Sequence, residues 1–243
     1  MNFYNLTRQH FTKAITSGLD CVLPRSCCVC ESPGEDICHR CSLAVSRQSK
    51  LRCHGCALTK ACDCNKPGWA IDRTIALTSY EPPYDRLIGE MKFQSKQSIG
   101  QILGNLMGKQ LQEIVEKEKL DHRRFSLMPI PLSSARFRQR GFNQALSIAK
   151  ALQKQVPRAA ISLNTGLTRT ADKQSQSTLD RAQRLVNLSN AYALSANFDN
   201  ATKPHIILVD DVMTTGATLN TCAALLKRNG IHEVWAMVAA RTE

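Results

Sequence analysis

The sequence predicts an α/β protein with a mainly parallel sheet, preceded by a small metal-stabilised module. After residue 69, short runs of β-branched and aliphatic residues alternate with amphipathic helical stretches, which is typical of parallel sheets flanked by helices. Ten of the eleven cysteines lie between Cys21 and Cys64. We therefore expect an N-terminal helix at residues 1–20, a cysteine-rich module at residues 21–68 and an α/β domain at residues 69–243.

Composition narrows the classes of partner and compartment. The 243 residues carry a formal net charge of +12 and a pI near 9.4, which favours phosphorylated or polyanionic partners. No stretch approaches the roughly 20 apolar residues of a membrane span, and residues 1–24 lack the apolar core of a signal peptide. We expect a cytoplasmic protein with no membrane insertion. In that reducing compartment, clustered cysteines indicate metal binding rather than disulfides.

The cysteine spacing predicts two structural zinc sites. A Cys-x-x-Cys pair presents two thiolates from one tight turn, and two pairs complete a tetrahedral Zn²⁺ site. The final pair is Cys62-Asp63-Cys64, one residue shorter than the others, and a redox dithiol is the alternative interpretation. Spacing to Cys30 favours Cys27 over Cys28. The predicted ligands are Cys27, Cys30, Cys38 and Cys41 for the first site, and Cys53, Cys56, Cys62 and Cys64 for the second.

Residues 205–219 predict a site for a phosphorylated ribose. Ile206 to Val209 has the pattern of a strand buried on both faces, and Asp210 and Asp211 follow it. A short loop of hydroxyl side chains and one glycine then leads into an apolar helix. Backbone amides at residues 215–218, with the helix N-terminus behind them, would form a cradle for one phosphate. Carboxylates beside that cradle would accept hydrogen bonds from ribose hydroxyls.

The remaining elements follow from apolar periodicity. A helical pattern begins at Tyr84 and continues at helical spacing through Val115 as a long amphipathic helix. Other helices are expected at residues 6–19, in the segment that follows Gln144 and ends at Leu152, and from Leu219 to Leu226. Cys222 is expected to be a small buried residue on the last of these helices. Strands are expected at residues 71–80, 125–130, 161–169, 191–194 and 233–240.

A basic segment follows the strand at residues 125–130. Arg136, Arg138 and Arg140 occupy alternate positions there, and such arginines would present guanidinium groups toward one pocket. A solvated basic loop is the alternative. A second polar segment, Thr170 to Thr178, has no hydrophobic periodicity.

Together these motifs resemble two known families. The strand, acid pair and hydroxyl loop resemble the phosphoribosyl-pyrophosphate (PRPP) signature of type I phosphoribosyltransferases. The order of three motifs along the chain resembles the ComF family of competence-associated proteins. The motifs are the cysteine pairs, then the run Pro129-Ile-Pro-Leu132 with Arg140-Gly-Phe-Asn-Gln144, and last the PRPP signature. The resemblance covers nearly the whole chain. It implies a type I phosphoribosyltransferase fold with an N-terminal double zinc ribbon.

The resemblance also implies roles for individual residues. The acids would bind the ribose hydroxyls and the loop the 5′-phosphate, the PRPP ligands being Asp210, Asp211, Met213, Thr214, Thr215, Gly216, Ala217 and Thr218. The pyrophosphate side would be formed by Pro129, Ile130, Pro131, Leu132, Arg136, Arg138 and Arg140. A mobile hood at Thr170 to Thr178 would have in it or beside it Arg169, Lys173, Gln176, Arg181, Arg184 and Asn187. Catalytic candidates are Asp210, Asp211, Lys173 and Arg181.

The predicted function is PRPP binding, linked to DNA uptake or nucleotide metabolism. An enzyme of this kind would displace pyrophosphate from C1 of PRPP, with Mg²⁺ bridging pyrophosphate and ribose. No residue identifies an acceptor base, so two alternatives stay open. One is a non-catalytic PRPP sensor or single-stranded-DNA-binding adaptor in transformation. The other is a regulator whose zinc ribbon docks a competence helicase or another DNA-processing protein.

Overall fold

The computed structural model describes residues 26–49, 52–60, 62, 64, 67–120, 123–156, 160–170, 191–196, 198 and 205–243. Its contacts divide the chain into two units, Met1–Leu43 and Ala44–Glu243, and each is described by itself. The helix expected at residues 6–19 and the residues of the expected hood after Thr170 lie outside the described ranges. The domain boundaries at residues 20 and 68 stay predictions.

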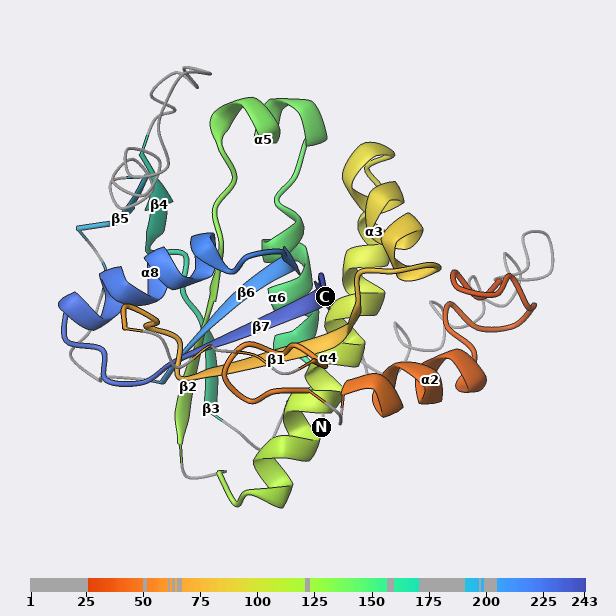
Figure 1. The fold of residues 1–243 in the computed structure, drawn as a ribbon. Coiled ribbons are helices and arrows are strands. Elements are labelled where there is room, and N and C mark those ends of the chain that lie inside the picture. The colour runs from red at the N-terminus through yellow and green to blue at the C-terminus, as the bar shows by residue number, and fades with distance from the viewer. Residues whose placement is uncertain are drawn as a thin grey trace, which may run out of the picture. The chain divides into compact units, whose positions relative to one another are not determined.

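A five-stranded parallel sheet forms the centre of the larger unit, in the order β1-β7-β6-β2-β3 (Figure 1). β6 lies between β7 and β2, and its residues from Ile206 to Val209 are fully buried, as the aliphatic run predicts. The fold class expected from the sequence, an α/β protein with a mainly parallel sheet, is confirmed. The strands are β1 (Arg73–Ser79), β2 (Arg124–Pro129), β3 (Ala160–Leu163), β6 (His205–Met213) and β7 (Val234–Arg241).

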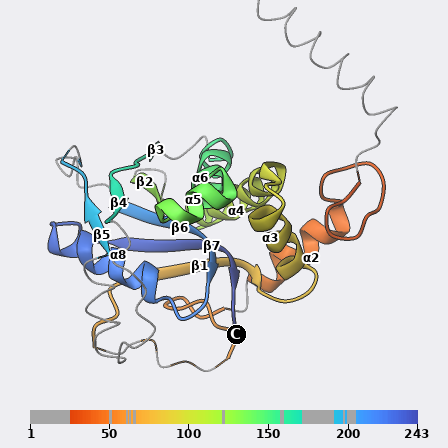
Figure 2. The ribbon, with the colours of Figure 1, turned by 90° about the horizontal axis from the view of Figure 1, so that it is seen from above.

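Helices cover both faces of this sheet (Figure 2). α4 (Gln97–Lys117) and α6 (Gln144–Gln153) lie on one face, and α8 (Ala217–Arg228) lies on the other. α8 buries Leu219, Cys222 and Leu226, so the expectation of a buried Cys222 is confirmed. The smaller elements are α2 (His39–Ser49), α3 (Tyr84–Phe93) and α5 (Ser134–Arg140). Among the described helices, none is both long and apolar enough to cross a bilayer.

Two expected elements are divided in the structure. The helical pattern from Tyr84 to Val115 forms two helices, because the chain turns between Phe93 and Gln97, with Ser95 in a left-handed conformation at φ 53°. The strand expected at residues 161–169 is also interrupted. β3 belongs to the main sheet, whereas β4 (Leu167–Arg169) pairs antiparallel with β5 (Tyr192–Leu194) in a second sheet. Asn164 stabilises the turn between β3 and β4, because its side chain accepts a hydrogen bond from the Gly166 amide at 2.7 Å.

The arginine-rich segment is a helix, α5, and not the solvated basic loop that the sequence leaves as the alternative. The Ser133 hydroxyl accepts a hydrogen bond from the Arg136 amide at 3.3 Å and caps the N-terminus. Gly141 ends the helix at φ 75° and donates its amide hydrogen to the Phe137 carbonyl at 2.8 Å. Both capping residues are present in the sequence, so local signals for this helix existed.

Three glycines let α4 approach α6 closely. A Cβ atom at Gly104 would lie 2.4 Å from the Ile148 carbonyl oxygen, and one at Gly108 would lie 2.5 Å from Gln155 Cβ. At Gly100 the corresponding atom would be 3.0 Å from Ser147 Oγ. The three glycines recur every fourth residue and therefore share one face of α4. Glycine at these positions sets the distance between the two helices.

We predict that G104A destabilises the protein even though alanine is the better helix former by about 1 kcal/mol. The added methyl group overlaps backbone of α6, and overpacking of this kind costs about 1–3 kcal/mol. G89A in α3 is the matched control, because no atom lies within 4 Å of the position that its methyl group would take, and only helix propensity changes. Urea denaturation should give a lower free energy of unfolding for G104A and an equal or higher one for G89A. Equal stability of G104A and the parent would show that the helix spacing is not set by these glycines.

Candidate functional site

Two carboxylates lie within β6, close to its carboxyl end. The Asp211 amide donates a hydrogen bond to Asp210 Oδ1 at 2.8 Å, which orients the Asp210 side chain against the backbone. Asp211 is buried, and Lys92 Nζ of α3 lies 3.1 Å from its Oδ1 atom. Adjacent strand residues point to opposite sides. The two acids therefore face different neighbours across the end of one strand.

The environment of Asp210 disfavours its charged form. Burial raises the pKa of Asp210 to about 8, and the negative charge of Asp211 adds to the effect. The positive charges of Lys92 and Arg136 act in the opposite direction on this pKa. Burial also raises the pKa of Tyr192, and Asp210 contributes to that shift as well. A ligand or cation that restores the charged form of Asp210 would therefore find a site prepared for it.

Lys92 is a site residue that sequence reasoning missed. It lies in the last turn of α3, and its side chain is 16% exposed. The preceding residues Leu87, Ile88 and Met91 form the buried face of that helix. A lysine next to such a face is usually solvated, so its position in the sequence carries no signal. Only the tertiary contact with Asp211 identifies it.

The hydroxyl loop follows directly on β6. Met213 is buried at the end of the strand, and Thr214 and Thr215 are exposed. Gly216 has φ 79°, and a Cβ atom there would lie 2.7 Å from Trp69 Cη2. Glycine is therefore required both by conformation and by the close approach of the indole ring.

The N-terminus of α8 opens onto this loop. α8 begins at Ala217 and includes Thr218, and its N-cap, Gly216, has no side chain to bind the first-turn amides. The Ala217 amide donates a hydrogen bond to Thr215 Oγ1 at 3.3 Å. A helix N-terminus beside two exposed hydroxyl groups is chemically suited to bind a phosphate.

The segment before β1 braces the same helix. Asn220 of α8 accepts a hydrogen bond from the Ala70 amide at 2.6 Å and donates one to the Gly68 carbonyl at 2.9 Å. These two bonds hold Trp69 against Gly216. The loop geometry therefore depends on residues about 150 positions away in the sequence, as the spacing of Asn220 and Ala70 shows.

The segment expected to bind pyrophosphate runs beside the end of β6. Pro129 ends β2, and the Ile130 amide donates to the Val209 carbonyl at 2.9 Å. The Asn143 side chain donates to the Ile130 carbonyl at 3.0 Å and accepts from the Leu146 amide at 3.3 Å, so one residue fixes the segment and caps α6. Pro131 and Leu132 complete the connection to α5.

The three arginines of α5 do not share one direction. Residues two positions apart lie on different sides of a helix, whereas residues four apart share a face. Arg136 is close enough to Asp210 to act on its pKa, and Arg140 donates to Gln144 Oε1 at 3.1 Å. Arg138 is exposed.

Of the predicted hood residues, Arg169 lies over the Tyr192 ring at 5.7 Å. The others, Lys173, Gln176, Arg181, Arg184 and Asn187, lie outside the described ranges.

Eight cysteines form two groups of four, the same eight that the sequence predicts. Within each group the sulfur atoms all lie within 4.8 Å of one another. The Sγ–Sγ distance is 3.6 Å for Cys30–Cys38, for Cys53–Cys64 and for Cys62–Cys64. Zn²⁺ with four thiolates at about 2.3 Å places neighbouring sulfur atoms about 3.8 Å apart. Both groups therefore fit a tetrahedral zinc ion, including the short Cys62–Cys64 pair.

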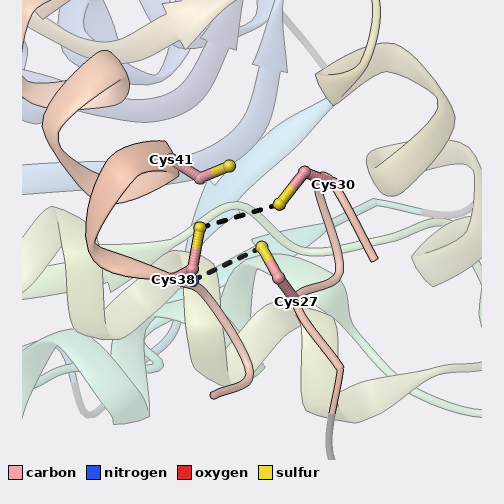
Figure 3. Close-up of side chains that lie close together, drawn as sticks. All are labelled: Cys27, Cys30, Cys38 and Cys41. Carbon is pink, nitrogen blue, oxygen red and sulfur yellow. Dashed lines mark hydrogen bonds between the residues drawn. The ribbon is translucent and has the colours of Figure 1, made fainter. Parts of the chain in front are cut away.

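The first group has the hydrogen bonds of a metal-binding knuckle (Figure 3). The Cys38 amide donates to Cys27 Sγ at 3.3 Å. A hydrogen bond from Ser32 lowers the pKa of the Cys30 thiol to about 6, which favours the thiolate that a metal requires. Cys28 is not part of the group, and burial raises its pKa to about 11. The spacing argument for Cys27 over Cys28 thus agrees with the geometry.

Several curated proteins are similar to this chain along most of its length. DNA utilization protein YhgH of Salmonella typhimurium is 30% identical over 90% of this chain and 98% of its own. Competence protein F of Haemophilus influenzae is 30% identical over 72% of this chain and 75% of its own. Competence protein ComFC of Bacillus subtilis is 39% identical over 44% of this chain and 40% of its own. No protein-family profile matches the chain. Because the identity with YhgH extends over nearly the whole of both proteins, and because the cysteine groups fit a zinc ribbon, the chain belongs to the ComF family.

Proposed function

We propose that the carboxyl end of β6 binds PRPP, and that this binding serves the handling of DNA during its uptake. The observation that carries the proposal is one continuous unit: a buried strand, two adjacent carboxylates, a glycine-dependent loop and a helix N-terminus. The carboxylates would accept hydrogen bonds from the ribose 2′ and 3′ hydroxyls. Residues 214–218 would surround the 5′-phosphate.

Positive charge around the acids supports a polyphosphate ligand. Lys92 of α3 forms an ion pair with Asp211, and Arg136 of α5 is close enough to Asp210 to lower its pKa. When the carboxylates bind the ribose, these cations would be available to the pyrophosphate group. Asp210 and Asp211 offer the hard oxygen atoms that Mg²⁺ prefers, and bound Mg²⁺ would neutralise pyrophosphate charge.

In the enzymatic form of the proposal, an acceptor nucleophile attacks C1 of PRPP and pyrophosphate leaves with the bonding electron pair. Arg136 would stabilise the charge of the leaving group, and the acids would hold the ribose. In the non-catalytic form, the same contacts report the presence of PRPP. We also propose that both cysteine groups hold zinc. The cytoplasmic location and the helicase-like partner remain predictions.

A second candidate function, binding of single-stranded DNA, has its own structural support. Phe93 and Phe137 are 75% and 51% exposed, although phenylalanine side chains are usually buried. Phe93 follows Lys92, and Phe137 lies between Arg136 and Arg138. The Ser95 hydroxyl donates to the Arg140 carbonyl at 3.0 Å, which ties the turn after α3 to the end of α5. Exposed aromatic rings beside cationic side chains are the usual means of binding single strands. The names of the YhgH and competence relatives agree with this candidate.

Replacing both acids by alanine should abolish most PRPP affinity. Each lost hydrogen bond to a charged group costs about 1.5–3 kcal/mol, so the affinity of the double variant should fall on the order of a hundredfold or more. Calorimetry with PRPP and Mg²⁺ measures the change. D85A removes a carboxylate of α3 outside the site and is the control. Equal affinities for the folded double variant and the parent would reject the proposed ribose contacts.

PRPP affinity should increase with pH, because Asp210 is protonated below a pKa of about 8 and charged above it. Only the carboxylate form offers its full set of acceptors to the ribose. The gain should be roughly tenfold between about pH 7 and about pH 9, a range in which phosphate groups with a pKa near 6 are already ionised. D210N cannot titrate and should show a nearly flat profile. Parallel pH profiles for D210N and the parent would assign the dependence to another group.

Removing one exposed ring should weaken binding of single-stranded DNA. A stacked base contributes about 1–3 kcal/mol, so F137A should reduce affinity by roughly 5- to 100-fold. R138A should instead reduce the slope of affinity against salt concentration by about 0.7, the effect of one phosphate contact. R228A, an exposed arginine at the end of α8, is the charge-matched control. Fluorescence anisotropy with labelled oligonucleotides measures both quantities. If F137A and R228A have the same affinity for the oligonucleotide, helix α5 does not bind the DNA.

A further inference from the structure

Arg241 connects two parts of the larger unit that are far apart in sequence. It is the last residue of β7, it pairs with Met213 in the sheet register, and it is 6% exposed. Its Nη1 atom donates to the carbonyl oxygens of Met213 at 3.1 Å and of Thr214. These carbonyls belong to the last residue of β6 and to the first residue of the hydroxyl loop. A buried guanidinium thus holds the loop from the side of its carbonyl groups.

The other edge of the same guanidinium contacts the second cysteine group. Arg241 Nε donates to the Cys56 carbonyl at 3.0 Å. Cys56 is buried, and the knuckle around it is tight, because a Cβ atom at Gly55 would lie 2.7 Å from Cys64 Sγ. Because Cys56 is itself a member of the group of four, its carbonyl is only a few bonds away from one of the clustered sulfur atoms.

Further bonds attach this knuckle to the sheet and to the end of the chain. The Thr74 amide and hydroxyl of β1 donate to the carbonyls of His54 and Gly55, both at 2.8 Å. The Glu243 carboxylate accepts from Arg52 at 2.9 Å and from the Thr59 hydroxyl at 2.7 Å. Residues 52–59 are thus held at several points. Among these contacts, that of Arg241 joins the segment to the carbonyls of Met213 and Thr214.

We propose that Arg241 is a positioning residue that couples the second cysteine group (Cys53, Cys56, Cys62 and Cys64) to the hydroxyl loop. Metal at this group holds the Cys56 carbonyl, the carbonyl orients Arg241, and Arg241 fixes the loop for phosphate. Without the metal, the buried guanidinium loses an acceptor and the loop loses its support. Phosphate affinity therefore depends on metal at the second group. The effect on ligand affinity rests on the proposed PRPP function. The effect on the loop itself does not, because it is measured in the ligand-free protein.

Two cysteine variants separate this effect from metal loss in general. C62S and C30S each replace an exposed ligand of one group, and each should lower the zinc content from about two to about one per chain by the four-thiolate rule. Hydrogen exchange of the ligand-free protein then reports on the peptide containing residues 213–218. C62S should speed exchange in this peptide on the order of tenfold, and C30S should leave it unchanged. Affinity for PRPP with Mg²⁺ should fall by a similar factor in C62S only.

Substitution of the arginine tests the connection itself. R241Q should retain both zinc ions but loosen the same peptide, and R241K should restore part of the protection because it keeps the charge. L111A, a core change in α4, controls for lower stability alone and should not alter the loop selectively. If C62S loses its zinc while the loop exchange stays at the parent rate, the inference is overturned. If the parent binds no PRPP, the proposed function fails, and the exchange comparison still decides the coupling.

Discussion

Repulsion between two adjacent carboxylates is the constraint around which the site is built. Asp210 and Asp211 lie at the end of a central strand, where little water screens their charges. Lys92 from α3 and Arg136 from α5 offset part of this repulsion, but burial and the charge of Asp211 together still raise the pKa of Asp210. The cations that keep two acids together therefore lie beside them at the end of β6, so this place offers groups suited to anions next to groups suited to hydroxyls.

Much of this arrangement is predictable from local sequence. The aliphatic run from Ile206 to Val209 indicates β6, since four such residues in succession are typical of a strand covered on both faces. The spacing of the cysteines predicts both groups of four, because two cysteines so close in sequence can present both thiolates to one ion. Gly216 and the hydroxyl residues around it identify the loop in the same way.

Tertiary contacts explain what the sequence does not reveal. In the sequence, Lys92 cannot be distinguished from a surface lysine, nor Arg241 from any residue at the end of a strand. Their contacts with Asp211 and with the Cys56 carbonyl identify them. The alternation of Arg136, Arg138 and Arg140 resembles an extended segment, whereas the caps at Ser133 and Gly141 produce a helix that separates their directions. Phe137 gives no indication of its exposure, because a phenylalanine in a helix is normally part of the core.

The contacts of the second knuckle with β1 have a consequence for self-association. β1 is an edge strand, and edge strands with free backbone groups recruit strands from other molecules. The His54 carbonyl already occupies the Thr74 amide, so the cysteine loop shields part of this edge. A folded loop in this place hinders β-pairing with other molecules. Unfolding of this loop would open the sheet edge to intermolecular β-pairing.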